Sequence, residues 1–542
     1  MFLNQCRRTS ESEPVLESKR PYLIIQKGNS QLYVEKEPFI ILGGQLLNSS
    51  ASNLNNLDPK WDSLKALNIN TVILPISWQQ FEPEEGEFNY YLIDGLISKA
   101  REYKLHLVII WYGSWKGGMS GYVPEWVINN PDRFPRMENN EGKKLEIISC
   151  FSKETRNADT KAFIQLMKHL KEVDQKRNTV LMVQVQDEIG LPGSSRDYSS
   201  LAEIAFQQNV PVQLIEHLEK NIDKINPVIH ELWKNMRYKK KGTWQDVFGV
   251  SEKTNEIFMA WHYAIYINNI IEKGRAEYRL PLYVNTRIDD KASDDGNKTS
   301  GSPVIELLDI WKAGAPEIDF YAVSSFGDNF VDDCENYNQD YNPLFVPSAC
   351  ALWKYDTLSA AAKSFYIIGN QNTIGFAPYG IDHKVYSGKH SLAKAYQVLG
   401  SLASFIIDAR TDQKIKGFMQ TDSIVEHCNF ENISLQIDYN VNKPFNYPGF
   451  GLAIQTSENE FIIAGNGCNI RFKSLNKEKP NISVIWVEEG QFVDGEWKTK
   501  RVIGGDEMLE QGTAGIKLPP DNSNLKVDIN EITVQKVKIF LH

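Results

Sequence analysis

Eight short apolar runs, separated by longer amphipathic segments, dominate the first 390 residues. The runs begin at Phe39, Thr71, Leu105, Thr179, Leu280, Ile318, Pro343 and Thr373. Such runs are typical of buried parallel strands, and the segments between them, such as DTKAFIQLMKHLKEVD from Asp159, have helical periodicity. Eight strands with helical crossovers predict a (β/α)8 TIM barrel, an α/β fold whose functional side chains lie at the C-terminal strand ends.

The chain divides into three predicted parts. Residues 1–30 are expected to form an N-terminal tail, and residues 31–390 the barrel, with a helical insertion near residues 197–279. Residues 391–542 begin with a helical stretch and continue with short alternating runs, among them GFGLAIQT from Gly449 and ISVIWVEEGQF from Ile482. Period-two alternation broken by Gly, Asn and Pro predicts a C-terminal antiparallel β-sandwich, whose main expected role is to pack against the barrel.

Composition excludes several classes of function. The net charge of -10 carries no basic stripe, which argues against a nucleic-acid partner. The six cysteines are scattered without metal-type spacing and no glycine-rich phosphate loop occurs, so neither a metal nor a cofactor is expected. No apolar run approaches the roughly 20 residues of a membrane span, and the start MFLNQCRRTSESEP lacks the apolar core of a signal peptide.

Polar and aromatic side chains follow the predicted strands. They are Gln45, Asn48, Trp78, Gln79, Glu82, Trp111, Trp115, Lys116, Asp187, Glu188, Asn285, Arg287, Phe326, Asp328, Ser348, Tyr379 and Asp382. Aromatic rings stack on the apolar faces of pyranose rings, while amides and carboxylates bind the hydroxyl groups. The inventory therefore favours a carbohydrate ligand over a phosphate or a nucleotide.

The most informative strand end is LMVQVQDEIG, residues 181–190. An apolar strand has no structural need for two adjacent acids at its end, so Asp187 and Glu188 are candidate catalytic groups. Glu188 is the better candidate for a general acid.

At the level of whole motifs, the chain resembles a known enzyme family. The stretches GGQLLNSSASN, LPISWQQFEPEEGEFNY, WYGSWKGGMSGYVPEWV, VQVQDEIG, NPLFVP and IGFAPYGID together resemble β-galactosidase-like enzymes of glycoside hydrolase family 35 and its family 42 relatives. The resemblance runs from about residue 30 to the C-terminus. It implies a retaining site, with an Asn-Glu pair after strand four as acid/base and a glutamate after strand seven as nucleophile, roughly 5–5.5 Å apart. It also implies a periplasmic or secreted location.

The departures from this pattern fall at the site itself. Glu188 matches the acid/base, but Ser348 stands where the resemblance implies the nucleophile, and Asp187 where it implies asparagine. Phe326 replaces an expected tyrosine, and two glutamines occupy positions that are often glutamate in relatives. The residues expected to bind substrate are Gln45, Asn48, Trp78, Gln79, Trp111, Trp115, Lys116, Phe326 and Asp382.

Two hypotheses of different classes remain open. The first is a β-galactosidase-type glycoside hydrolase acting on a β-linked oligosaccharide or polysaccharide, with Glu188 as acid and a water-mediated route. Inverting enzymes hold their carboxyl groups roughly 6.5–9.5 Å apart, and Asp187, Asp328 or Asp382 would then serve as base. The second is a pseudoenzyme that binds carbohydrate without cleaving it. A third interpretation is that Ser348 was engineered in place of the nucleophile to trap substrate. One such change would not explain why Asp187 and Phe326 also depart from the family pattern.

Overall fold

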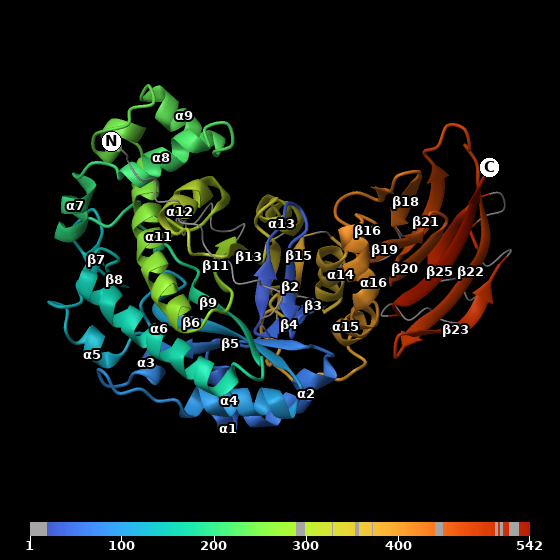
Figure 1. The fold of residues 1–542 in the computed structure, drawn as a ribbon, viewed down its shortest axis with the longest axis horizontal. Helices are drawn as coiled ribbons and strands as arrows, with labels where there is room; N and C mark the ends of the chain where they lie inside the picture. The colour runs from blue at the N-terminus through green and yellow to red at the C-terminus, as the bar shows by residue number, and fades with distance from the viewer. Residues whose placement is uncertain are drawn as a thin grey trace, which may run out of the picture.

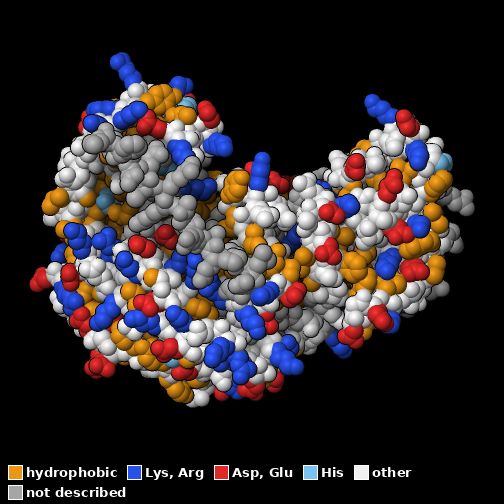
Figure 2. All heavy atoms as spheres, in the orientation of Figure 1, with side chains coloured by type: hydrophobic (Ala, Val, Ile, Leu, Met, Phe, Trp, Pro, Cys, Tyr) orange, Lys and Arg blue, Asp and Glu red, His pale blue; other side chains and the backbone are white. Residues whose placement is uncertain are grey.

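The computed structural model describes residues 19–288, 299–327, 329–352, 357–370, 372–439, 448–504, 508–509, 513–519 and 531–542. No helix within these ranges is long and apolar enough to cross a membrane. On the face drawn in Figure 2, lysine and arginine side chains are interspersed with aspartate and glutamate.

Eight parallel strands close into a barrel in the order β11-β13-β14-β15-β4-β5-β6-β9 (Figure 1). In chain order they are β4 (Ile41–Gln45), β5 (Thr71–Ser77), β6 (His106–Lys116), β9 (Val180–Asp187), β11 (Leu282–Ile288), β13 (Phe320–Ser325), β14 (Leu344–Ala349) and β15 (Thr373–Pro378). Each of the eight predicted runs overlaps one of these strands, which confirms the predicted TIM barrel.

Both faces of the barrel wall are buried, which explains why its strands are nearly continuous apolar runs. Inward-facing residues such as Ile73, Val108 and Phe345 form the interior, and Leu74, Ile109 and Val183 pack against the surrounding helices. The layer of helices includes α2 (Trp61–Ala66), α4 (Tyr91–Glu102), α6 (Lys153–Asp174), α11 (Glu252–Glu277), α12 (Leu308–Gly314), α13 (Phe330–Tyr337), α14 (Thr357–Ile368), α15 (Ser391–Ser401) and α16 (Ala403–Thr411).

Smaller elements decorate the barrel. Residues 200–248 carry α7 (Ser200–Phe206), α8 (Val212–Lys220), α9 (Pro227–Asn235) and α10 (Trp244–Phe248). The loops near the strand ends hold α1 (Leu54–Leu57), α3 (Trp78–Phe81), α5 (Glu125–Ile128), β7 (Arg136–Glu138), β8 (Lys144–Ile148), β10 (Leu191–Pro192) and β12 (Thr299–Ser300).

The predicted N-terminal tail of residues 1–30 is wrong in its last part. β1 (Tyr22–Ile24), β2 (Gln31–Val34) and β3 (Glu37–Phe39) form an antiparallel sheet. Its alternating side chains bury Leu32 and Val34 against Ile41 at the start of the first barrel strand, so this sheet closes the N-terminal end of the barrel.

The C-terminal part is an antiparallel β-sandwich, as predicted. One sheet has the order β16-β19-β20-β25-β22-β23 and the other β17-β18-β21-β24, with an apolar core between them. The strands are β16 (Ile415–Met419), β17 (Val425–Asn429), β18 (Ile433–Tyr439), β19 (Phe450–Ser457), β20 (Glu460–Asn466), β21 (Cys468–Ser474), β22 (Ile482–Val493), β23 (Glu496–Ile503), β24 (Gly515–Leu518) and β25 (Thr533–Leu541).

The sandwich packs against the helices that follow the last barrel strands (Figure 1). The ring of Phe365 on α14 lies 5.2 Å from that of Phe450, and Phe405 on α16 lies 4.7 Å from Phe492. These contacts lie on the outer side of the barrel, and the C-terminal strand ends are left to build a site.

Candidate active site

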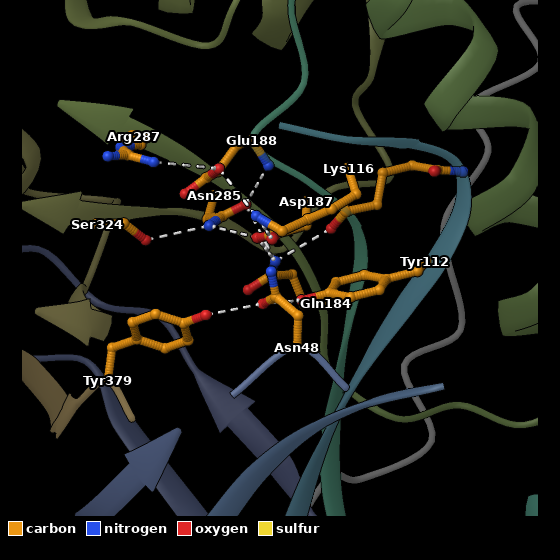
Figure 3. Close-up of polar contacts among 11 residues, drawn as sticks. Asn48, Tyr112, Lys116, Gln184, Asp187, Glu188, Asn285, Arg287, Ser324 and Tyr379 are labelled. Atoms are coloured by element: carbon orange, nitrogen blue, oxygen red, sulfur yellow. Dashed lines mark hydrogen bonds and ion pairs between the residues drawn. The ribbon is translucent and has the colours of Figure 1, made fainter. Parts of the chain in front are cut away.

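The ends of β6 and β9 build the centre of the site. Lys116, at the end of β6, is paired in register with Asp187 at the end of β9. Its Nζ lies 2.8 Å from Asp187 Oδ2 and 3.0 Å from Glu188 Oε2 (Figure 3). The three side chains are only 15%, 4% and 12% exposed. Both candidate acids therefore bind the same ammonium group.

An unusual backbone turns these two acids into the mouth of the barrel. Gln186 and Glu188 have φ angles of 64° and 52°, in the left-handed backbone region that residues other than glycine rarely adopt. Because this breaks the alternation of the strand, Gln184 Nε2 reaches Asp187 Oδ1 at 2.7 Å. Local strain of this kind is concentrated at functional sites, where the surrounding structure holds it in place.

Residues of the next strands fix the acid pair from the other side. Asn285 on β11 donates from Nδ2 to Asp187 Oδ1 at 2.9 Å, and its Oδ1 accepts from the backbone N–H of Glu188 at 3.0 Å. Asn285 also donates to Ser324 Oγ on β13 at 3.1 Å. Arg287, half exposed, places Nη1 4.0 Å from Glu188 Oε2. Four strands thus hold one polar network (Figure 3).

The charge of Lys116 is secure within this network. Burial lowers the pKa of the ammonium group, but the carboxylates of Asp187 and Glu188 outweigh burial and raise that pKa above its ordinary value of 10.5. A charged lysine is thus held between two carboxylates that belong to adjacent residues. Asp187 and Glu188 consequently lie on one side of the mouth and cannot flank a bound sugar from opposite faces.

A small cavity lies beside this centre. Tyr112 on β6 and Tyr379 after β15 both donate to Asn48 Oδ1, each at 3.0 Å. Burial raises the pKa of both phenols, so they remain neutral donors. The cavity has a volume of about 200 Å³ and is lined by Asn48, Ser49, Ser52, Pro75, Ser77, Gln79, Gln80, Tyr112 and Tyr122. Asn48 and Gln79, both predicted from sequence, therefore lie together at this cavity.

Ser348 occupies the corresponding end of β14. It is paired in register with Ser324, whose hydroxyl group belongs to the network of Asn285 and Asp187. Neighbours in register on parallel strands share a face, so Ser348 faces the mouth with Ser324. Phe326 lies at the same rim, with its ring 6.2 Å from that of Tyr379 and 5.3 Å from the Arg287 guanidinium group.

Three of the predicted sugar-stacking residues do not face the mouth. Trp78, Trp111 and Trp115 are 0%, 0% and 1% exposed. Their indole N–H groups donate to Glu82 Oε2, Asp159 Oδ1 and the carbonyl oxygen of Ile148. A fully enclosed ring has no face to offer a ligand, so the predicted stacking contacts are wrong, and these rings belong to the core.

The structure also contradicts the prediction that Asp382 binds substrate or acts as a base. Its side chain is 0% exposed, accepts from the backbone N–H of Leu47 at 2.9 Å, and forms an ion pair with Lys60. It holds the loop after β4 and is inaccessible to a substrate or to a water molecule that it would activate. Gln45 is also buried, and its backbone carbonyl oxygen accepts from the backbone N–H groups of Gly380 and Ile381. Asp328 lies outside the described residues.

Several residues of the network escaped the sequence prediction. Gln184, Ser324 and Tyr112 lie within predicted strands and are therefore expected in the barrel wall, whereas Tyr122 lies in the loop after β6. A polar Gln184 inside the apolar run LMVQVQ was the one available signal, because a buried amide needs partners. Within the described ranges, no group of His, Cys, Asp and Glu side chains could hold a metal ion.

Comparisons of sequence agree with this geometry. Residues 51–250 match the β-galactosidase family of glycoside hydrolase family 42, and residues 392–513 match a domain of unknown function, DUF5597. No curated protein sequence matches the chain.

Comparisons of structure extend to nearly the whole chain. A family 42 β-galactosidase from G. stearothermophilus, solved as a catalytic mutant, aligns over 96% of this chain and 100% of its own, with 9% identity and a TM-score of 0.52. The β-galactosidase of Bacillus circulans sp. alkalophilus aligns over 68% of this chain with 11% identity and a TM-score of 0.46, and the match spans 57% of that enzyme. The β-galactosidase of Rahnella sp. R3 gives 12% identity over 70% of this chain and 58% of its own, with a TM-score of 0.46. The chain thus combines a barrel whose fold is like that of the β-galactosidases, with residues 51–250 matching the family 42 model, and a C-terminal part in which residues 392–513 match DUF5597.

Proposed function

We propose that the mouth of this β-galactosidase-type barrel binds a β-linked oligosaccharide or polysaccharide and does not cleave it by double displacement. The proposal is supported by the end of β14, where Ser348 occupies the position at which the family resemblance implies a nucleophilic carboxylate. The strand LFVPSA contains no acid at all.

A serine hydroxyl cannot take over this task. Without an adjacent base the hydroxyl is a weak nucleophile, and it supplies no negative charge beneath an oxocarbenium-like transition state. The two acids of the site do not supply that charge either, because both are bound to Lys116 on the β9 side of the mouth.

The remaining groups suit a sugar. Hydroxyl groups of a saccharide both donate and accept, and the mouth offers the Asn48 amide, the Tyr379 hydroxyl and the Asp187 and Glu188 carboxylates. The cavity of about 200 Å³ beside Asn48 is the size of a single small ligand group. We therefore assign the cavity to one sugar unit of a longer ligand.

A second candidate function rests on a separate observation. Glu188 keeps part of its side chain exposed and is oriented by Lys116, Arg287 and Asn285. In its protonated form, a carboxyl group fixed at the mouth in this way can give its proton to the departing glycosidic oxygen, while a water molecule attacks the anomeric carbon and releases a proton to solvent, which is hydrolysis by single displacement. In this route the product has the inverted anomeric configuration.

Isothermal titration calorimetry with a panel of β-linked galacto-oligosaccharides and plant-wall oligosaccharides tests the proposal. We expect binding by the unaltered protein and at least about tenfold weaker binding after Asn48→Ala. This change removes the acceptor that the Tyr112 and Tyr379 hydroxyls share, and it removes one residue of the cavity lining. Glu458→Gln, an exposed change in a sandwich turn, should bind as the unaltered protein does. Absence of binding to every member of the panel, or equal binding by Asn48→Ala, would overturn the proposal.

A further inference from the structure

A buried carboxylate behind the site joins the two strands that carry its charged groups. Asp159 lies in the first half of α6 and is completely enclosed. Its Oδ2 accepts from Ser114 Oγ at 2.6 Å and from the Ser114 backbone N–H at 3.1 Å, both on β6. The same oxygen accepts from Gln186 Nε2 on β9 at 2.7 Å. One side chain therefore spans the ends of β6 and β9.

The contacts of Asp159 lead directly to the charged centre. Gln186 precedes Asp187 and has the left-handed backbone that turns the acid pair into the mouth. Its amide is held at both ends, because Nε2 donates to Asp159 and Oε1 accepts from the backbone N–H of Trp115 at 2.9 Å. Trp115 in turn precedes Lys116. The clamp thus acts on Trp115, one residue before Lys116, and on Gln186, one residue before Asp187.

The chain makes room for this clamp at Gly113. A Cβ atom at this position would lie 2.5 Å from Asp159 Oδ1, 2.5 Å from Trp111 Nε1 and 2.6 Å from Gln186 Nε2. Distances below 3.0 Å are not tolerated by real Cβ atoms, so a side chain here would push the three polar groups apart. The Trp111 indole N–H donates to Asp159 Oδ1 at 2.8 Å, and the Tyr266 hydroxyl donates to Asp159 Oδ2 at 3.4 Å.

We infer that Asp159 is a positioning residue, which fixes Lys116 between Asp187 and Glu188 by clamping Gln186 and Ser114 from behind. It touches no ligand and acts through these two residues. That this clamp serves saccharide binding rests on the proposed function, whereas its effect on the strand ends does not.

The same helix supplies a matched control. Asp174, the last residue of α6, is also buried and accepts from the backbone N–H groups of Thr179 and Val180, at 3.0 and 2.7 Å. It therefore joins α6 to the start of β9 as Asp159 joins it to the end of the same strand. Changing either aspartate to asparagine removes one buried charge from one helix, but only Asp159→Asn affects the mouth.

Hydrogen exchange measured by mass spectrometry on the full chain separates positioning from general stability. For Asp159→Asn we expect exchange at least about tenfold faster in peptides covering residues 112–118 and 185–189, the factor for losing one hydrogen bond to a charged group. Asp174→Asn should accelerate residues 177–181 and leave the other two peptides unchanged. If Asp159→Asn does not fold, Ser114→Ala removes one donor only and should accelerate the same two peptides to a smaller extent.

Unchanged exchange of residues 185–189 in the folded variants, or equal acceleration throughout the barrel, would overturn the inference. Calorimetry with the saccharide that the unaltered protein binds best then tests the link to function, with at least about tenfold weaker binding expected for Asp159→Asn but not for Asp174→Asn. If the unaltered protein binds no saccharide, the proposed function fails, while the exchange data still decide the role of Asp159.

Discussion

Replacing Lys116 by methionine removes the ammonium group that binds the carboxylates of both Asp187 and Glu188. The methionine keeps most of the apolar stem and leaves Asp187 and Glu188 as two adjacent carboxylates with little exposure. Removing one partner of a buried ion pair costs about 3–5 kcal/mol. Because the three side chains are between 4% and 15% exposed, we expect the lower end of this range, about 3 kcal/mol of unfolding free energy at pH 7.

The pH dependence of this cost follows from the direction of the pKa shift. The folded-state pKa of Lys116 lies above the ordinary value of 10.5, so its stabilising contribution is complete below about pH 10.5 and is lost only in more alkaline solution. The Lys116→Met variant should therefore be destabilised equally at pH 7 and at about pH 9.5.

Urea-induced unfolding followed by tryptophan fluorescence measures this cost, because the large buried tryptophans lie in the barrel. Lys99→Met is the control, since the ion pairs of Lys99 with Asp58 and Glu102 lie at the surface and should contribute little. A loss below about 1 kcal/mol at pH 7, the value of a surface pair, would refute the reasoning. A loss that vanishes at about pH 9.5 would refute it as well, because Lys116 would then be uncharged.

Two further changes probe the nucleophile position and the core. Ser348→Glu should introduce slow hydrolysis of a β-galactoside with retained configuration, measured by product NMR, and no gain over the unaltered protein would mean that the site lacks more than this carboxylate. His262 packs against Phe151 and Trp244, and burial lowers its pKa from 6.5 to about 3. The unfolded chain then binds a proton below pH 6.5 that the folded chain does not bind, so stability falls as the pH falls from 6.5 toward 3. His262→Phe should remove about 2 kcal/mol of the loss between pH 7 and pH 5 in chemical unfolding; an equal loss in both proteins would contradict this.

The barrel was predictable because the apolar pattern of each strand lies within a short stretch of sequence. A strand buried on both faces must be apolar at successive positions, so runs such as TVILPISW and LHLVIIWYG can be recognised as strands from the sequence alone. The sandwich was also predictable from short stretches of sequence, because its strands alternate apolar and polar residues with a period of two. β1 was missed because a three-residue strand at an edge carries too few apolar positions to stand out.

The candidate site was predictable only in part, because its assignment depends on contacts between distant residues. Glu188 and Lys116 stand at strand ends and were found there. Trp111 stands near the end of a predicted run, but in the structure it lies in the middle of β6, and its indole N–H donates to Asp159, 48 residues further along the chain. The contact between Asn48 and Tyr379 joins residues 331 positions apart and exists only because the barrel closes. A strand-end position therefore identifies candidates, and tertiary packing decides which of them face the mouth.

Anomeric product analysis by NMR tests the central claim most directly. The unaltered protein and Glu188→Gln are incubated with the same panel of β-linked galactosides and plant-wall oligosaccharides, and the first anomer released is identified. We expect no Glu188-dependent release of the retained β-anomer from any saccharide that the protein binds in calorimetry. Glu188-dependent release of the inverted anomer would establish the single-displacement route. Glu188-dependent release of the retained β-anomer would contradict the account, because another group would then replace the carboxylate missing at Ser348.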